Sequence, residues 1–344
     1  MHLKKLSINK IPFLILILIL FCLIALSIGP TKIDIFTTCK ILLSQIPGWE
    51  QLLPENVKES QITIILKIRL PRIILAALVG MALATVGASF QGIFKNPMAD
   101  PYIIGISSGA ALGAAIAIVT NLSFILGSLA TSLMAFLTGL LSIFVVYNLA
   151  RDGNRVPIHN LLLAGVALSA FMSAMMSLLM VINSKEMSQI VFWLLGSFSL
   201  SNWSQVLVAT PIILSGIVGL IFFARELNLM IFGENTAQHL GVNTEQTKII
   251  ILIIGTLTVA TAVSISGKIG FVGLIVPHTI RLLVGPNHKI LLPVSAIAGG
   301  IFMVLTDTIA RSLLNGTEIP VGIITALCGA PFFIYLLKKR KMIS

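Results

Sequence analysis

Ionisable side chains inside long apolar runs are the groups of this sequence that could do chemistry. Asp307 and Arg311 are four residues apart, so on a helix they share one face and the arginine can partly neutralise the acid. Such an acid fits either a structural ion pair, which we favour, or one step of a proton relay. His278 follows Pro277, and we expect it to cap or bond the backbone groups that the proline frees.

The sequence motifs of common enzymes are missing. Gly267-Lys268-Ile269 is similar to the end of a phosphate-binding GxxxxGK[ST] loop, but it lacks the first glycine and the hydroxyl residue. There is no HExxH and no pair of intramembrane aspartates, and the five histidines are scattered. Cys22, Cys39 and Cys328 lie far apart without metal-type spacing. We therefore expect no catalysis, metal site or cofactor in this chain, and uphill transport would need an ion gradient or another subunit.

Three arginines stand at the ends of apolar runs. Arg69 and Arg72, in RLPR, begin one run, and Arg311 ends another. They could extend to lipid headgroups, as long basic side chains do at membrane surfaces. They could instead form a basic landing site for an acidic partner that arrives from outside the cell. The residues themselves leave both interpretations open.

The longest polar break in the second half of the chain, Arg225 to Lys248, is called the polar segment below. We expect two short helices in it: Gly233 can open a turn, Glu234 to Leu240 can form a helix, and Gly241 suits a left-handed cap. Its apolar residues lie among polar ones, as on a surface that fits another protein's groove; they are Ile231, Phe232, Ala237, Leu240 and Val242. An ordinary connecting loop is the alternative.

Membrane-spanning helices must position these residues. Of 344 residues, 57% are hydrophobic and 10% charged, and the mean hydropathy is +1.03, which exceeds what a soluble core needs. A bilayer-spanning helix needs about 20 apolar residues. Such runs predict an all-α polytopic membrane protein, residues 1–344 forming one domain, with spans near 12–30, 67–92, 102–120, 123–149, 160–182, 205–224, 247–266, 271–285, 290–312 and 320–337. The short eighth span could be a broken helix buried in protein.

The distribution of charge predicts the orientation of the spans. An even number of spans puts both termini on one side, and a cytoplasmic position of the termini places most of the 23 Lys and Arg residues inside. The polar segment is then cytoplasmic too. The net charge of +11 therefore reflects topology at the lipid bilayer, and nucleic acid is not an expected partner.

Small residues and prolines predict how two neighbouring spans pack and connect. Close helix contacts are expected where small residues repeat about every fourth position, namely at Gly80, Ala84 and Gly87 and at Gly105, Gly109 and Gly113. Between these spans KNPMADP (95–101) has two prolines and two Asx side chains, and we expect a stiff cytoplasmic turn.

Several long motifs resemble one family of membrane proteins. RLPRIILAALVGMALATVGASFQGIFKNPMADPYIIGISSGAALGA (Arg69–Ala114) resembles the signature of the FecCD family, the permease subunits of type II ABC importers for iron–siderophore, haem and cobalamin. GKIGFVGLIVPHTIRLLVGPNHKILLPVSAIAGG (Gly267–Gly300), TDTIAR (Thr306–Arg311) and EIPVGIITALCGAPFFIYLL (Glu318–Leu337) are similar to the same family. The resemblance runs from about Leu66 to Leu337, and residues 1–65, a first span and an outer loop, fall outside it.

The resemblance implies an assembly and roles for individual residues. It implies ten spans, two permease subunits of the same or different sequence with the pathway between them, two copies of a cytoplasmic ATP-binding subunit, and an extracytoplasmic solute-binding protein. Residues of the polar segment look like the family's ATPase-coupling helices: Gly233, Glu234, Ala237, Leu240, Gly241 and Val242. Arg69, Arg72 and Arg311 match outer arginines that meet acidic residues of the binding protein. Ile158, His159 and Asn160 look like part of an inner gate.

The expected function follows from that resemblance. We expect an ATP-driven importer that carries an iron chelate, a siderophore complex or haem, across the cytoplasmic (inner) membrane of a bacterial cell, with cobalamin as the nearest alternative cargo. An ion-coupled secondary transporter is a second alternative, because Asp307 is an acid that could lie within the membrane. A purely structural or receptor-like membrane protein is a third and weaker alternative.

Overall fold

A computed structural model describes residues 10–53, 57–153, 156–314 and 317–341, and these residues are helical or irregular, with no strand among them. Each predicted span corresponds to one apolar helix: α1 (Ile11–Ser27), α4 (Leu70–Ile93), α5 (Ile106–Val119), α7 (Ala130–Ala150), α8 (Ile158–Ile182), α10 (Trp203–Phe222), α13 (Thr244–Ser266), α14 (Val272–Val284), α15 (His288–Ser312) and α16 (Val321–Lys341). The prediction of an all-α polytopic membrane protein is confirmed.

Shorter helices connect these spans. The connecting α-helices are α2 (Ile35–Leu43), α3 (Glu59–Thr63), α6 (Ser123–Leu126), α9 (Met187–Leu194), α11 (Ala224–Ile231) and α12 (Glu234–His239). Four further turns are 3-10 or π-helical: η2 (Glu50–Leu52), η3 (Ile64–Arg69), η4 (Pro101–Ile104) and η5 (Gly127–Leu129). Because α3, η3 and α4 follow one another directly, residues 59–93 form one continuous helical rod.

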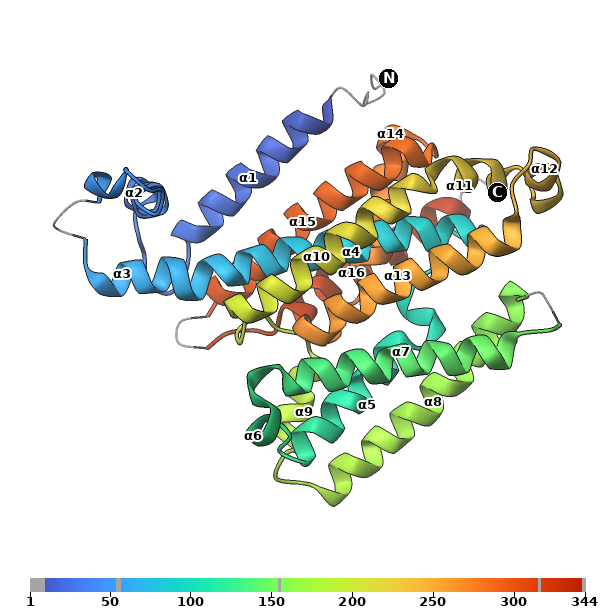
Figure 1. The fold of residues 1–344 in the computed structure, drawn as a ribbon, viewed down its shortest axis with the longest axis horizontal. Helices are drawn as coiled ribbons and strands as arrows, with labels where there is room; N and C mark the ends of the chain where they lie inside the picture. The colour runs from blue at the N-terminus through green and yellow to red at the C-terminus, as the bar shows by residue number, and fades with distance from the viewer. Residues whose placement is uncertain (1–9, 54–56, 154–155, 315–316, 342–344) are drawn as a thin grey trace.

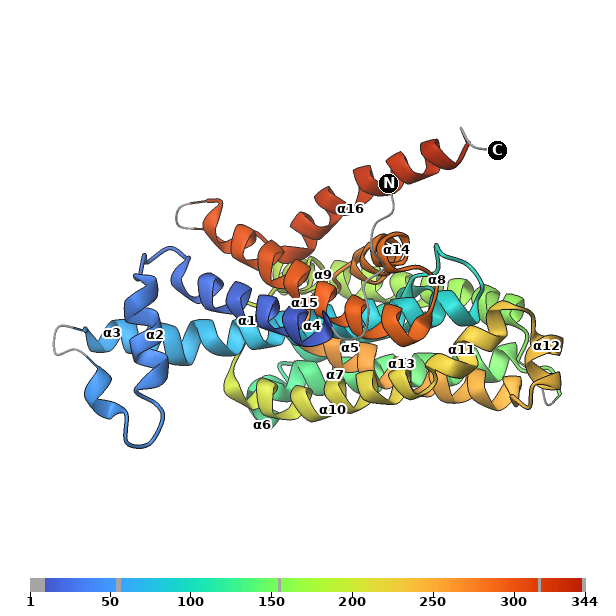
Figure 2. The same cartoon turned by 90° about the horizontal axis from the view of Figure 1, so that it is seen from above.

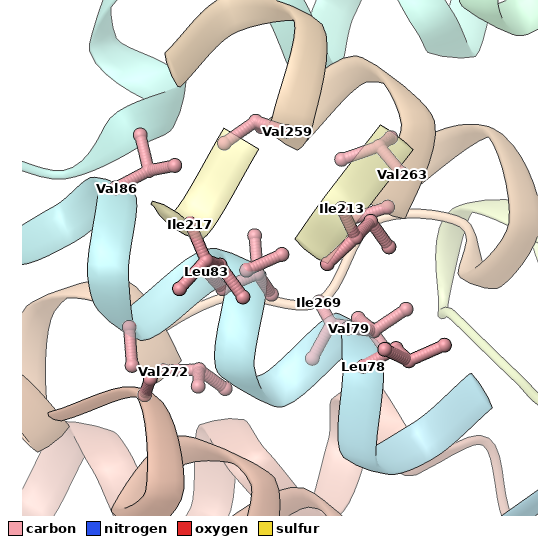
Figure 3. Close-up of a cluster of buried hydrophobic side chains, with 14 of the residues drawn as sticks. Leu78, Val79, Leu83, Val86, Ile213, Ile217, Val259, Val263, Ile269 and Val272 are labelled. Atoms are coloured by element: carbon pink, nitrogen blue, oxygen red, sulfur yellow. The ribbon is translucent and has the colours of Figure 1, made fainter. Parts of the chain in front are cut away.

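Helix α4 lies at the centre of the bundle, and nearly all of its side chains are buried. It packs against α10, α13, α14 and α15, and Figure 3 shows Val79 and Leu83 of α4 facing Ile213 and Ile217 of α10 and Val259 and Val263 of α13. A Cβ on Gly80 would collide with the carbonyl group of Gly299, and one on Gly87 with that of Gly273. The close packing predicted from small residues is therefore confirmed in α4.

Helices α5, α7 and α8 form a second group on one flank of α13 (Figure 1). Here too glycines allow the contact, because a Cβ on Gly109 would lie 2.7 Å from the side chain of Ser142 and from the carbonyl oxygen of Thr138. Helix α8 is largely exposed along its length. Among the described helices α16 packs mainly against α14 and α15, and it diverges from the rest of the bundle in Figure 2.

Two segments of the chain leave the helical pattern inside the bundle. The eighth span is short as expected: α14 has 13 residues and begins after the non-helical stretch 267–271. The expected turn at 95–101 needs a correction, because it does not stay at the end of the bundle. Pro101 packs beside Gly273, which itself lies against Leu83 of α4, so the chain has already returned to the middle of α4 when α5 begins. Non-helical backbone at this depth is tolerated because protein surrounds it.

The bundle has two distinct ends (Figure 1). The α2 end carries α2, η2 and α3, which pack around the buried side chains of Ile33, Ile41 and Ile65. The α12 end carries α11 and α12. The start of α1 and the end of α16 both point toward the α12 end (Figures 1 and 2). The two ends therefore hold different groups of the residues singled out by sequence.

Candidate functional site

Arg72 is the centre of a buried ion-pair cluster at the α2 end. Its Nε donates to both carboxylate oxygens of Asp307, at 3.1 and 3.0 Å, and its Nη2 donates to Oδ1 at 3.0 Å. Its Nη1 donates to both oxygens of Glu318, at 2.9 and 2.8 Å. The side chains of Arg72 and Asp307 are 7% and 1% exposed, whereas that of Glu318 is 40% exposed. One guanidinium thus joins α4, α15 and the segment before α16 through two forked contacts.

The other two arginines donate hydrogen bonds to carbonyl groups at the end of α1. Nη1 of Arg69 donates to the carbonyl oxygen of Leu26 at 2.7 Å, and its Nη2 donates to that of Thr31. Nη2 of Arg311 donates to the carbonyl oxygen of Ala25. The last carbonyl groups of a helix have no partner within the helix and carry partial negative charge. Because α1 has no basic residue in its own last turn, the two distant arginines provide the positive charge there.

These contacts change the interpretation of the three arginines. All three are buried, so they do not extend to lipid headgroups, and their guanidinium groups do not form an exposed landing surface in this chain. The reason is that carboxylates and helix carbonyl groups of the same chain hold them. Asp307 also pairs mainly with Arg72; its contact with Nε of Arg311 is longer, at 3.9 Å. The sequence had no local signal for the roles of Glu318 and the α1 carbonyl groups, which come from distant segments.

Beside this cluster the α2 end has an open cavity of about 650 Å³. The corner between α1 and α2 lines it on one side, with Lys32 and Asp34, and the end of α15 lines it on the other, with Arg311 and Ser312. The Asp34 carboxylate is used to cap α2, because it accepts from the backbone nitrogen of Phe36 at 2.9 Å. The cavity is therefore a structured opening next to the buried arginines.

The polar segment lies at the α12 end and folds as predicted. Gly233, with φ of 120°, precedes α12, and Gly241, with φ of 84°, follows it in the left-handed region. The backbone nitrogen of Val242 donates to the carbonyl oxygen of Ala237 at 3.0 Å, which closes the C-terminal turn. Phe232 is 75% exposed and Leu240 56%, and Ile231 is exposed as well. These three exposed apolar side chains, at the ends of α11 and α12, are together called the apolar patch below.

Ala237 does not belong to that apolar patch. Its side chain is fully buried against its own chain, so it supports α12 and cannot contact a partner directly. Val242 is half-buried, while Glu234 is partly covered by an ion pair. Sequence spacing could not distinguish the two faces of a helix of only six residues.

Lys248 joins α12 to the first turns of α13. Its Nζ lies 3.2 Å from Oε2 of Glu234 and 2.5 Å from Oε1 of Glu245, and its side chain is only 8% exposed. Glu245 also accepts from the backbone nitrogen of Val156 at 3.4 Å. The ion pairs of Lys248, a first anchor of α12, were not predicted from the sequence, although the spacing of Glu245 and Lys248, three residues apart, is typical of a helical ion pair.

A second anchor joins α11 to α15. Nδ2 of Asn228 donates to Oδ1 of Asn287 at 2.8 Å, and Oδ1 of Asn228 accepts from the backbone nitrogen of His288 at 2.8 Å. The polar segment is therefore held at both of its ends, by α13 through Lys248 and by the start of α15 through Asn228. An external force on its apolar patch reaches these two spans directly.

The residues expected at an inner gate are close to the first anchor. Ile158, His159 and Asn160 form the first turn of α8 and lie two to four residues after Val156. Ile158 packs partly against the core, while His159 and Asn160 are exposed. The structure thus places them at the α12 end and connects them through Val156 and Glu245 to the polar segment, at the start of a largely exposed span. Among the described residues no three His, Cys, Asp or Glu side chains gather as metal ligands.

Comparison with known proteins gives the family of the chain. Residues 16–339 match the model of the FecCD transport family. The chain belongs to that family. The cobalamin import system permease protein of Halobacterium salinarum is 47% identical over 287 residues, 83% of this chain and 76% of the relative. The hemin transport system permease protein of Yersinia pestis is 40% identical over 279 residues, 80% of this chain and 83% of the relative.

The FecCD likeness extends to a solved structure. A metal-chelate type ABC transporter in an inward-facing conformation has a TM-score of 0.83 and 35% identity, covering 97% of this chain and all of its own. The FecCD match also corrects the expected limits of the resemblance, because it begins at residue 16 and includes most of α1. Apolar runs such as α1 carry few distinctive residues, so motif comparison alone did not detect it.

Proposed function

We propose that this FecCD protein is the permease subunit of an ATP-driven importer for a metal chelate, an iron–siderophore complex or haem, with cobalamin as the alternative cargo. Family membership and the likeness to a metal-chelate type transporter support the class of cargo. The observation that carries the ATP-driven mechanism is the exposed apolar patch of the polar segment, which is anchored to two spans. A connecting loop without a partner has no need of such an anchored patch.

The patch would insert into a groove of a cytoplasmic ATP-binding subunit, one copy for each of two permease subunits. Closure of the two ATPases would then move α13 through Lys248 and α15 through Asn228. The loop before α8 would follow through Glu245 and Val156, so that the turn at Ile158, His159 and Asn160 acts as the inner gate. In this proposal the α12 end and both termini are cytoplasmic, and the second permease subunit is this chain or a similar one.

The α2 end would receive the extracytoplasmic solute-binding protein. The buried arginines act there by holding α1, α15 and the segment before α16 in position, and the partner meets the exposed groups around them, Glu318 among these. An exposed ion pair contributes only about 0.2–1 kcal/mol, so charge at this surface would chiefly orient the partner.

The ion-coupled alternative has less support from the geometry. It needs an acid that can take up and release a proton within the membrane. Asp307 is 1% exposed, and its carboxylate already accepts three hydrogen bonds from Arg72, so it is engaged in a structural ion pair. We therefore assign the energy source to the ATPase partner.

An uptake assay in cells that lack this chain tests the proposal. Labelled ferric siderophores, haem and cobalamin are offered to these cells and to the same cells after the gene has been restored. Loss of one cargo and its rescue by the wild-type chain would support import and name the cargo. Rescue by a Phe232→Glu, Leu240→Glu variant that inserts normally would contradict the role of the apolar patch. A matched control is Leu207→Glu on the exposed face of α10, whose defect should be in insertion and abundance.

A further inference from the structure

Lys268 is an exposed cation in the interior of the membrane-spanning part of the chain. It lies in the non-helical stretch between α13 and α14, next to Ile269. Figure 3 shows Ile269 beside Val79 and Leu83. Val79 is the tenth of the 24 residues of α4, so it lies about 14 Å along the helix from Leu70. Lys268 thus lies beside an interior turn of a helical rod, residues 59–93, that is long enough to cross the roughly 30 Å of hydrocarbon of a bilayer.

The backbone at Lys268 is held in place by three other elements. A Cβ on Gly196, just after α9, would lie 2.7 Å from the carbonyl oxygen of Lys268, and a Cβ on Gly322, in the first turn of α16, would lie 3.2 Å from it. The hydroxyl of Tyr102 donates to the carbonyl oxygen of Ile269 at 2.9 Å. The main chain is therefore fixed beside α9, α16 and η4, and Lys268 is exposed.

The Lys268 ammonium has no ion-pair partner within 4 Å among the described residues. The acid in electrostatic range is Asp100, which lies on the segment before η4. Its carboxylate is half-buried and already accepts from the backbone nitrogen of Tyr102 at 2.8 Å. Asp100 lowers the positive electrostatic potential around Lys268, but the Lys268 ammonium can still bind another anion.

An exposed ammonium at this depth cannot face lipid without a large cost in free energy, so it faces water or a polar surface. Polar groups continue the same region, since Ser197 and the exposed Ser199 follow α9, and the backbone nitrogen of Ser197 donates to the carbonyl oxygen of Ser266 at 2.8 Å. The surface between α9 and α16 is therefore suited to an aqueous passage and not to the lipid phase.

We propose that Lys268 lines the translocation passage and makes it selective for anionic cargo, that is, chelates with free carboxylate or other negative groups. This inference rests on the proposed function and narrows its class of substrate. A single exposed cation attracts an anion without holding it tightly, which suits a passage that must also release its cargo. In an assembly of two such subunits, cations from both sides would add to the effect.

Thiol labelling tests the position of Lys268 without any need for cargo. In the assembled complex in liposomes, with Cys22, Cys39 and Cys328 replaced by serine, a Lys268→Cys variant should react with a membrane-impermeant methanethiosulfonate. Matched controls are Leu214→Cys on the exposed face of α10 and Val263→Cys, which is buried; both should stay unreacted. An unreactive Lys268→Cys, with and without ATP, would overturn the proposal, as an interface contact or lipid would then cover the position.

Transport tests the selectivity. We expect Lys268→Gln to lower uptake of anionic chelates, such as ferric citrate or haem, by up to roughly fivefold, the upper value given by one exposed ion pair of about 1 kcal/mol. Uptake of a neutral ferric hydroxamate should be unchanged, and Lys268→Arg should retain the wild-type ratio. An equal change for both kinds of cargo, or a wild type that imports only neutral chelates, would overturn the proposal. A wild-type complex that imports no chelate at all would instead refute the proposed function, while the labelling result would still report the position of Lys268.

Discussion

Arg72 places a full positive charge between two carboxylates where little water can reach. Removing one partner of a buried ion pair leaves the other charge without compensation, which costs about 3–5 kcal/mol. The exposed partner differs, because water can solvate Glu318 when the pair is broken. Breaking the pair with Asp307 should therefore cost more free energy than breaking the pair with Glu318, although the two carboxylates lie at similar distances from Arg72.

We therefore expect Arg72→Met to lower the free energy of unfolding by about 3–5 kcal/mol, because the buried Asp307 would lose its main ion-pair partner. Glu318→Gln should lower it by only about 0.2–1 kcal/mol. Thermal unfolding in detergent would measure both effects. The control is Arg72→Met combined with Asp307→Leu, which removes both buried charges and should recover part of the loss. Equal losses for Arg72→Met and Glu318→Gln would show that Asp307 is not isolated from water.

Gly87 decides how closely α4 and α14 approach each other. A Cβ at this position would overlap the carbonyl group of Gly273, and backbone cannot move aside as a side chain can. We expect Gly87→Ala to destabilise the protein by about 1–3 kcal/mol, the usual cost of overpacking. Gly139→Ala is the control, since its nearest neighbour would lie 3.5 Å away in ordinary contact. Differential scanning calorimetry would compare the melting temperatures of the two variants. Equal melting temperatures would refute the close packing at Gly87.

Among the elements, the polar segment shows how an exposed loop can transmit movement. Its apolar patch has no cover in the chain, but its two ends are fixed by Lys248 and Asn228. Movement of the apolar patch can be passed to a span only if the polar segment is firmly attached to that span. The ion pairs of Lys248, whose side chain is only 8% exposed, provide this attachment between α12 and α13. The contact of Glu245 with Val156 extends this attachment to α8.

We expect Lys248→Met to separate ATP hydrolysis from transport. The variant complex should still assemble and hydrolyse ATP, because the apolar patch is intact, but the uptake per ATP should fall several-fold, since Glu234 and Glu245 lose their common partner. Lys248→Arg, which keeps the charge, should restore most of the ratio. Parallel ATPase and uptake measurements in liposomes would reveal the change. A proportional fall in both activities would indicate a defect in folding or assembly instead.

Sequence patterns predicted the elements better than their contacts. The ten apolar runs, the left-handed Gly241 and the short eighth span follow from local composition, because bilayer thickness and backbone sterics act on a few neighbouring residues. The burial of Arg69 and Arg311 could not be predicted, because their acceptors are carbonyl groups of α1, which every residue carries regardless of its type. The return of Pro101 to the middle of α4 likewise depends on glycines in distant helices.

At the scale of the whole molecule, the two ends of the bundle differ in kind. The α2 end is a packed cap with buried charges and an open cavity, whereas the α12 end presents an anchored apolar patch. This difference between the two ends suits a protein that binds a different partner on each side of a membrane. The exposed α8 and the diverging α16 leave an apolar surface that lipid can cover and that suits the second permease subunit proposed above.

Cysteine labelling would test the proposed orientation. In a variant without native cysteines, Asn235→Cys on the exposed face of α12 should react only with reagents that reach the cytoplasm. Glu50→Cys, exposed at the α2 end, should react with impermeant reagents added to intact cells or spheroplasts. The two positions serve as controls for each other, because the same reagent should label one and spare the other. The reverse pattern would place the apolar patch outside the cell and exclude an intracellular ATPase as its partner.

The closure of α1 by distant arginines has a consequence for biosynthesis. The contact between Arg311 and Ala25 joins residues 286 positions apart, and a ribosome adding about 5–20 residues per second needs roughly 15–60 seconds to cover that distance. During this interval the last carbonyl groups of α1 have only Arg69 as a basic partner from the chain made so far. The end of α1 therefore gains its Arg311 contact only after α15 has been made, late in the synthesis of the chain.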